Sequence, residues 1–214
     1  MNHLYKRDLT NGSITGSMLR FALPLMLGNL LQQCYNIADT LIVGQVLGAE
    51  ALAAVGSSYA LIVFITSIFI GLCMGCSAVL SIQYGAKDIQ QMKQSIFSSL
   101  LIVGGTTLLL NILSLAFLSP IIKILQTPPE LEAMTYRYLF LIFLGMIPMA
   151  VYNFYAFLLR SVGNSSSPLY FLLISVALNI VLDVLFMVGL KMGVEGAALA
   201  TVISQIVSAT GIYL

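Results

Sequence analysis

Six long apolar stretches, separated by short segments rich in turn-forming residues, dominate this sequence. Each is close to or above the roughly 20 residues that an α-helix needs to cross a bilayer. Because lipid offers no hydrogen-bond partners, such stretches must satisfy their backbone groups internally, as helices. The sequence therefore predicts an all-α integral membrane protein. After a polar tail of residues 1–17, we expect a six-transmembrane-helix bundle over residues 18–214, with helices at about 18–46, 52–82, 96–118, 136–158, 169–190 and 194–214.

The composition excludes a water-soluble globule. Only 8% of the residues are charged and 59% are hydrophobic, whereas soluble domains have about 25% charged residues. The net charge of +1 offers no electrostatic footprint for nucleic acid. Basic residues gather in the tail, among them Lys6 and Arg7, and in the turns that follow the second and the fourth predicted helices. This bias predicts a multi-pass protein of the plasma or inner membrane with a cytoplasmic N-terminus and the lipid bilayer around it.

Two acids interrupt the apolar stretches. Only Asp39 and Asp183 lie well inside predicted spans, where burying an ionised carboxylate costs at least about 2.5 kcal/mol. Acids in such places face the bundle interior and mark ion or proton paths. The alternative is that each makes an interhelical hydrogen bond that only positions helices. No nucleophile–base pair or metal-ligand cluster accompanies them in the sequence, so we do not expect an enzyme, a cofactor or a resident metal.

Depth along the predicted helices brings further polar groups to the same level as these acids. Asn179 and Asp183 are four residues apart, and therefore on one helical face. At about 1.5 Å per residue, Thr201 and Asp39 fall at a similar depth. Carboxylate, amide and hydroxyl oxygens suit a proton or a small hard cation. Since two buried carboxylates disfavour being ionised together, we expect the group to take up H⁺ or Na⁺.

Prolines and glycines suggest how the bundle bends and packs. Pro24 and Pro148 fall inside predicted spans, where a proline frees a carbonyl and can kink a helix. They are candidates for hinges. The small-xxx-small spacing that lets membrane helices approach closely occurs at three glycine pairs, Gly44–Gly48, Gly71–Gly75 and Gly189–Gly193.

Two long motifs resemble the multidrug and toxic compound extrusion (MATE) family. They are "LPLMLGNLLQQCYNIADTLIVGQVLGAEALAAVG" and "RSVGNSSSPLYFLLISVALNIVLDVLFMVGLKMGVEGAALATVIS". The resemblance implies a cation-coupled antiporter that exports amphipathic, often cationic drugs in exchange for H⁺ or Na⁺. The family's coupling residues match Asp39, Asn179, Asp183 and Thr201, with a backbone carbonyl near Ala197 completing the set. Three weaker matches, expected as supporting polar groups, are Tyr35, Asn36 and Tyr138.

The family has twelve helices in two six-helix lobes, with the substrate path between them. The resemblance therefore implies that this sequence forms the N-lobe, without a C-lobe, and that a second lobe or a second half is its partner. Two other functions stay open. One is a flippase for lipid-linked oligosaccharide, of the same superfamily, which the lack of basic residues in mid-span disfavours. The other is a membrane interaction module that transports nothing.

Overall fold

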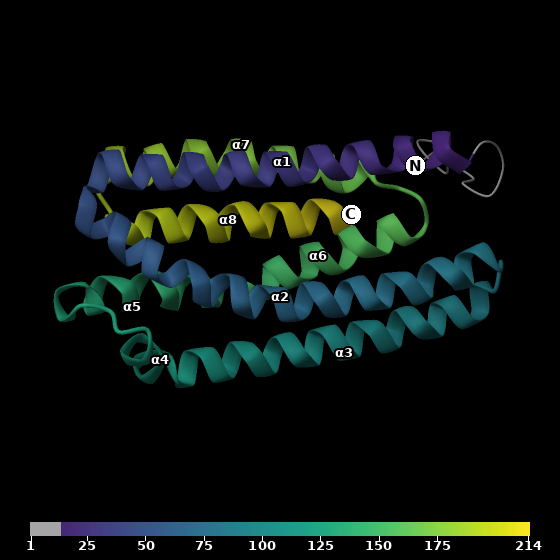
Figure 1. The fold of residues 1–214 in the computed structure, drawn as a ribbon, viewed down its shortest axis with the longest axis horizontal. Helices are drawn as coiled ribbons and strands as arrows, with labels where there is room; N and C mark the ends of the chain where they lie inside the picture. The colour runs from purple at the N-terminus through teal and green to yellow at the C-terminus, as the bar shows by residue number, and fades with distance from the viewer. Residues whose placement is uncertain (1–13) are drawn as a thin grey trace.

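The computed structural model describes residues 14–214, so Lys6, Arg7 and most of the predicted tail lie outside the described residues. Within this range the fold is helical and contains no strand, which confirms the predicted all-α membrane fold (Figure 1). The helices are α1 (Ile14–Leu47), α2 (Ala49–Gly85), α3 (Ile89–Ala116), α4 (Leu118–Ile124), α5 (Pro129–Leu144), α6 (Met146–Ser161), α7 (Ser166–Asp183), the π-helix η1 (Val184–Gly189) and α8 (Val194–Tyr213).

Fewer helices than the six predicted are apolar enough to cross a membrane by length and composition. Within residues 14–214, four qualify: α2, α3, α7 continued by η1, and α8; the bent pair α5 and α6 makes a fifth if it is one span. Helix α1 has 34 residues, but Gln32, Gln33, Asn36 and Asp39 lower its mean hydropathy. It also begins at Ile14, within the segment predicted as tail.

Two other helix boundaries differ from the prediction for local reasons. Helix α3 begins at Ile89 rather than near residue 96, because Asp88 caps it: the Asp88 carboxylate accepts a hydrogen bond of 3.0 Å from the Gln91 N–H. The predicted span 136–158 is broken at Gly145, where α5 and α6 meet with a bend of 43°. Pro148 lies in the first turn of α6, where its missing N–H costs no helical hydrogen bond.

Pro24 and Pro148 therefore differ in structure, although both were predicted as hinge candidates. Pro24 lies inside the uninterrupted helix α1, whereas Pro148 follows a break that already exists. Their role as hinges stays a prediction.

The glycines at close helix contacts are not the predicted pairs. A Cβ built on Gly71, Gly75, Gly48 or Gly193 meets no atom within 4 Å, and one on Gly44 makes only an ordinary contact, 3.4 Å from Leu52 of α2. The close contacts lie instead along α8: a Cβ on Gly211 would lie 2.8 Å from Phe171 of α7, and one on Gly145 would lie 2.5 Å from Val202. Helices α7, α6 and α5 all pack on α8. Its many buried small residues, such as Ala197, let these neighbours approach it.

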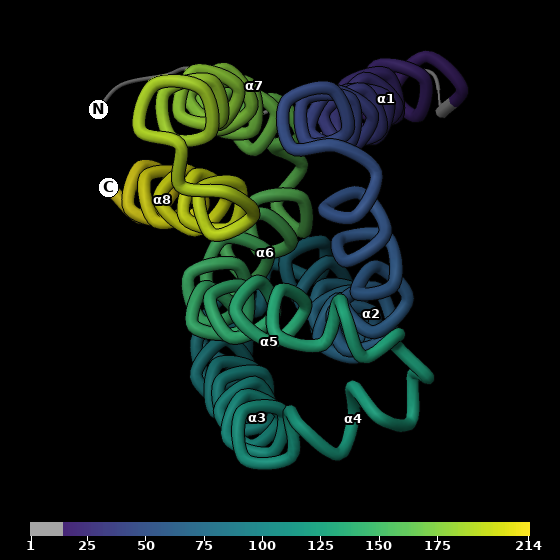
Figure 2. The backbone as a smooth tube through the Cα atoms, turned by 90° about the vertical axis from the view of Figure 1, so that its left-hand side faces the viewer, coloured from purple at the N-terminus to yellow at the C-terminus, as the bar shows by residue number. Residues whose placement is uncertain are grey.

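Helix α8 lies between α7 on one side and α5 and α6 on the other. In Figure 2, α1 and α7 lie side by side, α8 lies below α7, α6 and α5 follow, α2 descends from beneath α1, and α3 and α4 lie farthest from α1 and α7. Large apolar side chains of α3, such as Phe97 and Leu101, are exposed, as expected of a surface that faces lipid. The two helices α7 and α8, which pack on each other, carry five buried polar residues: Ser175, Asn179, Asp183, Ser204 and Ser208.

Candidate cation site

Two acids meet where α1 packs against α7. Asp183, the last residue of α7, is completely buried, and Asp39 of α1 is partly buried. Their carboxyl groups lie within hydrogen-bonding reach of each other. Two ionised carboxylates this close would repel each other, and neither could donate a hydrogen bond to the other. The arrangement therefore suits a positive charge, either a proton or a small cation, held between carboxyl oxygens.

The amide of Asn179, one turn before Asp183, links the acids to α8. Asn179 is buried, and its neighbours determine how its amide is oriented. In the favoured orientation Nδ2 donates to Asp183 Oδ2 at 2.8 Å, and Oδ1 accepts from the Thr201 N–H at 3.1 Å. The opposite orientation places Nδ2 3.4 Å from Thr201 Oγ1 and turns Oδ1 toward acceptors. An oxygen that faces only acceptors is destabilising, so the first orientation holds, and through it Asn179 ties Asp183 to the backbone of α8.

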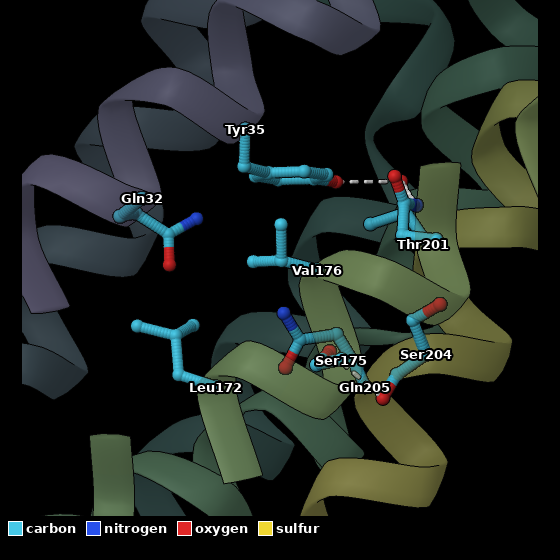
Figure 3. Close-up of a pocket in the computed structure, with 9 residues that line it drawn as sticks. Gln32, Tyr35, Leu172, Ser175, Val176, Thr201, Ser204 and Gln205 are labelled. Carbon is cyan, nitrogen blue, oxygen red and sulfur yellow. Dashed lines mark hydrogen bonds between the residues drawn. The ribbon is translucent and has the colours of Figure 1, made fainter. Parts of the chain in front are cut away.

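Tyr35, Tyr138, Thr201 and Ala197 complete the cluster. The Tyr35 hydroxyl of α1 reaches across to Thr201 Oγ1 of α8 at 3.1 Å (Figure 3). Tyr138 of α5 is buried and close enough to interact electrostatically with both acids. A regular helix pairs the Thr201 N–H with the Ala197 carbonyl. Because Asn179 competes for that N–H, the carbonyl of Ala197 keeps capacity for another partner.

Asn36 lies outside this cluster, contrary to the sequence prediction. It follows Tyr35 directly, and successive residues point about 100° apart around a helix. Its amide donates to Gln33 Oε1 at 3.1 Å. Both residues line a groove of about 540 Å³ between α1 and α2, together with Thr40 and Tyr59. Asn36 therefore belongs to the outer face of α1.

Two features of the site escaped the sequence analysis. Helix α7 passes into the π-helix η1 immediately after Asp183, and π-turns occur frequently at functional sites. In addition, Gln32, Ser175, Ser204 and Gln205 line a small chamber next to the cluster. Helical spacing could have indicated three of these residues. Ser175 lies four residues before Asn179 on α7, and Ser204 and Gln205 lie three and four residues after Thr201 on α8, so they share a helix face with predicted site residues.

Comparison with known proteins assigns this chain to a family. A family model described as MatE matches residues 24–185. The chain is 33% identical over 198 residues to "Probable multidrug resistance protein YpnP" of Bacillus subtilis (strain 168), a match that covers 92% of this chain and 44% of that protein. It is 32% identical over 197 residues to "Multidrug export protein MepA" of Staphylococcus aureus (strain NCTC 8325 / PS 47), covering 90% and 43%.

A solved structure agrees with these relatives. The "Crystal structure of MATE in complex with MaD5" superimposes with a TM-score of 0.91 at 27% identity, and the match covers 99% of this chain and 48% of that one. The fold and the matches define a multi-pass, all-helical membrane protein. The chain belongs to the MatE family, which confirms the resemblance to MATE proteins. It spans less than half the length of the relatives it matches.

Proposed function

We propose that this chain supplies the cation-coupling half of an antiporter that exports amphipathic, often cationic compounds in exchange for H⁺ or Na⁺. The observation that carries the proposal is the contact between the carboxyl groups of Asp39 and Asp183 inside the bundle. Relatives described as a multidrug resistance protein and a multidrug export protein support drug-like substrates. The basic tail and turns support a cytoplasmic N-terminus.

Occupancy of the acid pair would be coupled to the packing of α1 against α7. With a proton or cation present, the two carboxyl groups attract each other through it. Once it leaves, two carboxylates face each other in a medium of low dielectric constant, and their repulsion favours separation of the helices. A bound ion therefore shifts the population between two packings, which is how an ion gradient drives a conformational change.

The same residues can serve either ion. A proton needs only the two carboxyl groups and the Asn179 amide in its present orientation. Na⁺ would require the Asn179 oxygen to turn inward and would add Thr201 Oγ1 and the Ala197 carbonyl as ligands. All of these are oxygens, the ligands that hard cations prefer.

A second half or a second copy of the chain would cover the groove between α1 and α2. Gln33, Asn36 and Thr40 line this groove on the outer face of α1. Polar side chains in a membrane normally face protein or water rather than lipid. We infer that the substrate path runs along this groove, between the two halves.

Replacement of Asp39 and Asp183 by Asn, singly and together, tests the proposal in the protein as expressed from its own gene. Asn keeps the shape and the hydrogen bonds but cannot be ionised. In proteoliposomes, we expect efflux of a cationic dye to lose its dependence on a pH or Na⁺ gradient while the protein still folds. The control is Asp88→Asn, which changes an acid outside the site and preserves a helix cap.

Two results would reject the proposal. Unchanged gradient-driven efflux in the double variant would show that the acids do not couple transport to an ion. Loss of folding in both single variants would show that the acids only hold helices together.

A further inference from the structure

A small polar chamber adjoins the cation site between α1, α7 and α8 (Figure 3). Tyr35, Asn179 and Thr201 of the site form part of its wall. The rest of its polar wall includes Gln32, Ser204 and Gln205. Nothing in the proposed coupling step requires these three residues, so their presence in the bundle interior needs a separate explanation.

Two oxygens at this chamber have no hydrogen-bond partner among the described residues. They are Ser204 Oγ and Gln205 Oε1, both inaccessible to solvent. Ser204 is 2% exposed, and the nearby Ser175 hydroxyl is already engaged, because it donates to the Ser204 carbonyl at 3.0 Å. A buried polar atom without a partner is destabilising. The two oxygens therefore suit a ligand that donates hydrogen bonds.

The size of the chamber fits one water molecule. The volume of the chamber that the centre of a water molecule can occupy is about 10 Å³. This is close to the volume that a single buried water needs. A buried water also needs two to four polar partners. Ser204 Oγ and Gln205 Oε1 supply two, and the hydroxyls of Thr201 and Tyr35 border the same space.

On each of the helices α1, α7 and α8, the residues that line the chamber are displaced along the helix axis toward the same end of the bundle. Gln32 precedes Asp39 on α1 by about 10 Å of helix, and Ser175 precedes Asp183 on α7 by about 12 Å. Ser204 follows Thr201 on α8, which runs in the opposite direction, by about 5 Å. All three displacements point to the end of the bundle where α1 and α7 begin and α8 ends (Figure 1).

We propose that the chamber binds a water molecule, held by Ser204 and Gln205, which relays protons to and from the Asp39–Asp183 pair on the side of the bundle where α1 begins. This inference rests on the proposed function. The Tyr35 and Thr201 hydroxyls, 3.1 Å apart, line the chamber beside the pair, and a proton that leaves the pair would pass along them to the water. Each oxygen accepts one proton and releases another, so the relay returns to its starting composition and one additional carboxylate remains in the pair.

Variants at the chamber separate proton relay from proton binding. In Ser204→Ala and Gln205→Leu we expect the pair to keep its proton, seen as an unchanged protonated-carboxyl band in infrared difference spectra. We expect efflux driven by a pH gradient to slow by about tenfold, the factor that loss of one hydrogen bond in a rate-limiting step produces. Thr210→Ala is the control, since its exposed hydroxyl donates only to Ile206 of its own helix.

Each outcome for these variants bears on one claim. Efflux at the normal rate in both chamber variants would overturn the relay and leave the proposed function intact. Loss of the carboxyl band in Gln205→Leu would also overturn it, because Gln205 would then belong to the binding site itself. By contrast, unchanged efflux in the Asp39→Asn/Asp183→Asn protein would reject the proposed function.

A measurement on the unaltered protein decides the matter if the variants do not fold. Radiolytic labelling in ¹⁸O-water oxidises side chains next to bound water. We expect labelling of Val176, which lines the chamber, several-fold above that of Val181, which lies on the exposed surface of the same helix. Labelling of Val176 no greater than that of Val181 would overturn the proposal.

Discussion

A side chain at Gly145 should destabilise the protein, because Gly145 lies directly against Val202 of helix α8. A Cβ at Gly145 would lie 2.5 Å from Val202 Cγ2 and 3.2 Å from Val202 Cβ. Rotating Val202 relieves only the first contact, at a cost, since valine strongly prefers one rotamer in a helix. The second contact is relieved only if the backbone of α8 moves. Overpacking of this kind costs about 1–3 kcal/mol.

The expected net effect of Gly145→Ala is smaller than that cost. Alanine in place of glycine gains up to about 1 kcal/mol in a helix, and less at the junction where Gly145 lies. We therefore expect Gly145→Ala to lower the free energy of unfolding by about 1–2 kcal/mol, the overpacking cost less this gain. Gly105→Ala is the matched control: its Cβ meets nothing within 4 Å on α3, so it should be neutral or stabilising.

Equilibrium unfolding in mixed detergent micelles measures both variants. Adding Val202→Ala to Gly145→Ala removes Cγ2, the nearest clashing atom, and should recover part of the lost stability, which a double-mutant cycle quantifies. If Gly145→Ala is as stable as Gly105→Ala, the close contact between the α5–α6 junction and α8 is not present in the folded protein.

Two further predictions concern contacts between helices. Ser208→Ala removes the hydrogen bond of 3.0 Å that Ser208 Oγ of α8 donates to the Phe171 carbonyl of α7. It should lower the free energy of unfolding by about 0.6 kcal/mol, the average for such bonds in membranes. An effect no larger than that of Thr210→Ala would contradict this prediction. Arg137→Gln removes an exposed ion pair of 3.3 Å with Glu195 and should cost less than about 1 kcal/mol, with the difference vanishing in high salt. A loss of stability that persists in high salt would mean that Arg137 has another role.

The sequence was sufficient to predict the all-α membrane fold and the similar depths of four polar residues, because both depend on regularities along the chain. Apolar runs mark membrane helices whatever their neighbours are. The rise per residue puts Asp39, Asn179, Asp183 and Thr201 at similar depths, and the structure brings them together.

The errors concern how each helix is rotated and whether it continues. Tyr35 and Asn36 are adjacent, and only the packing of α1 shows which of them faces α8. A glycine at 145 and a proline at 148 are compatible with one kinked helix as well as with two separate helices. The break at Gly145 therefore could not be predicted. The glycine pairs failed for a similar reason, since spacing alone does not show which helix face meets a neighbour.

The protonated-carboxyl region of the infrared difference spectrum, recorded while pH is varied, tests most directly whether Asp39 and Asp183 share a positive charge. The account predicts a band that titrates with pH in the unaltered protein and is lost or shifted in both Asp39→Asn and Asp183→Asn. A spectrum that is the same in all three proteins would show that the two acids do not form a proton- or cation-binding pair.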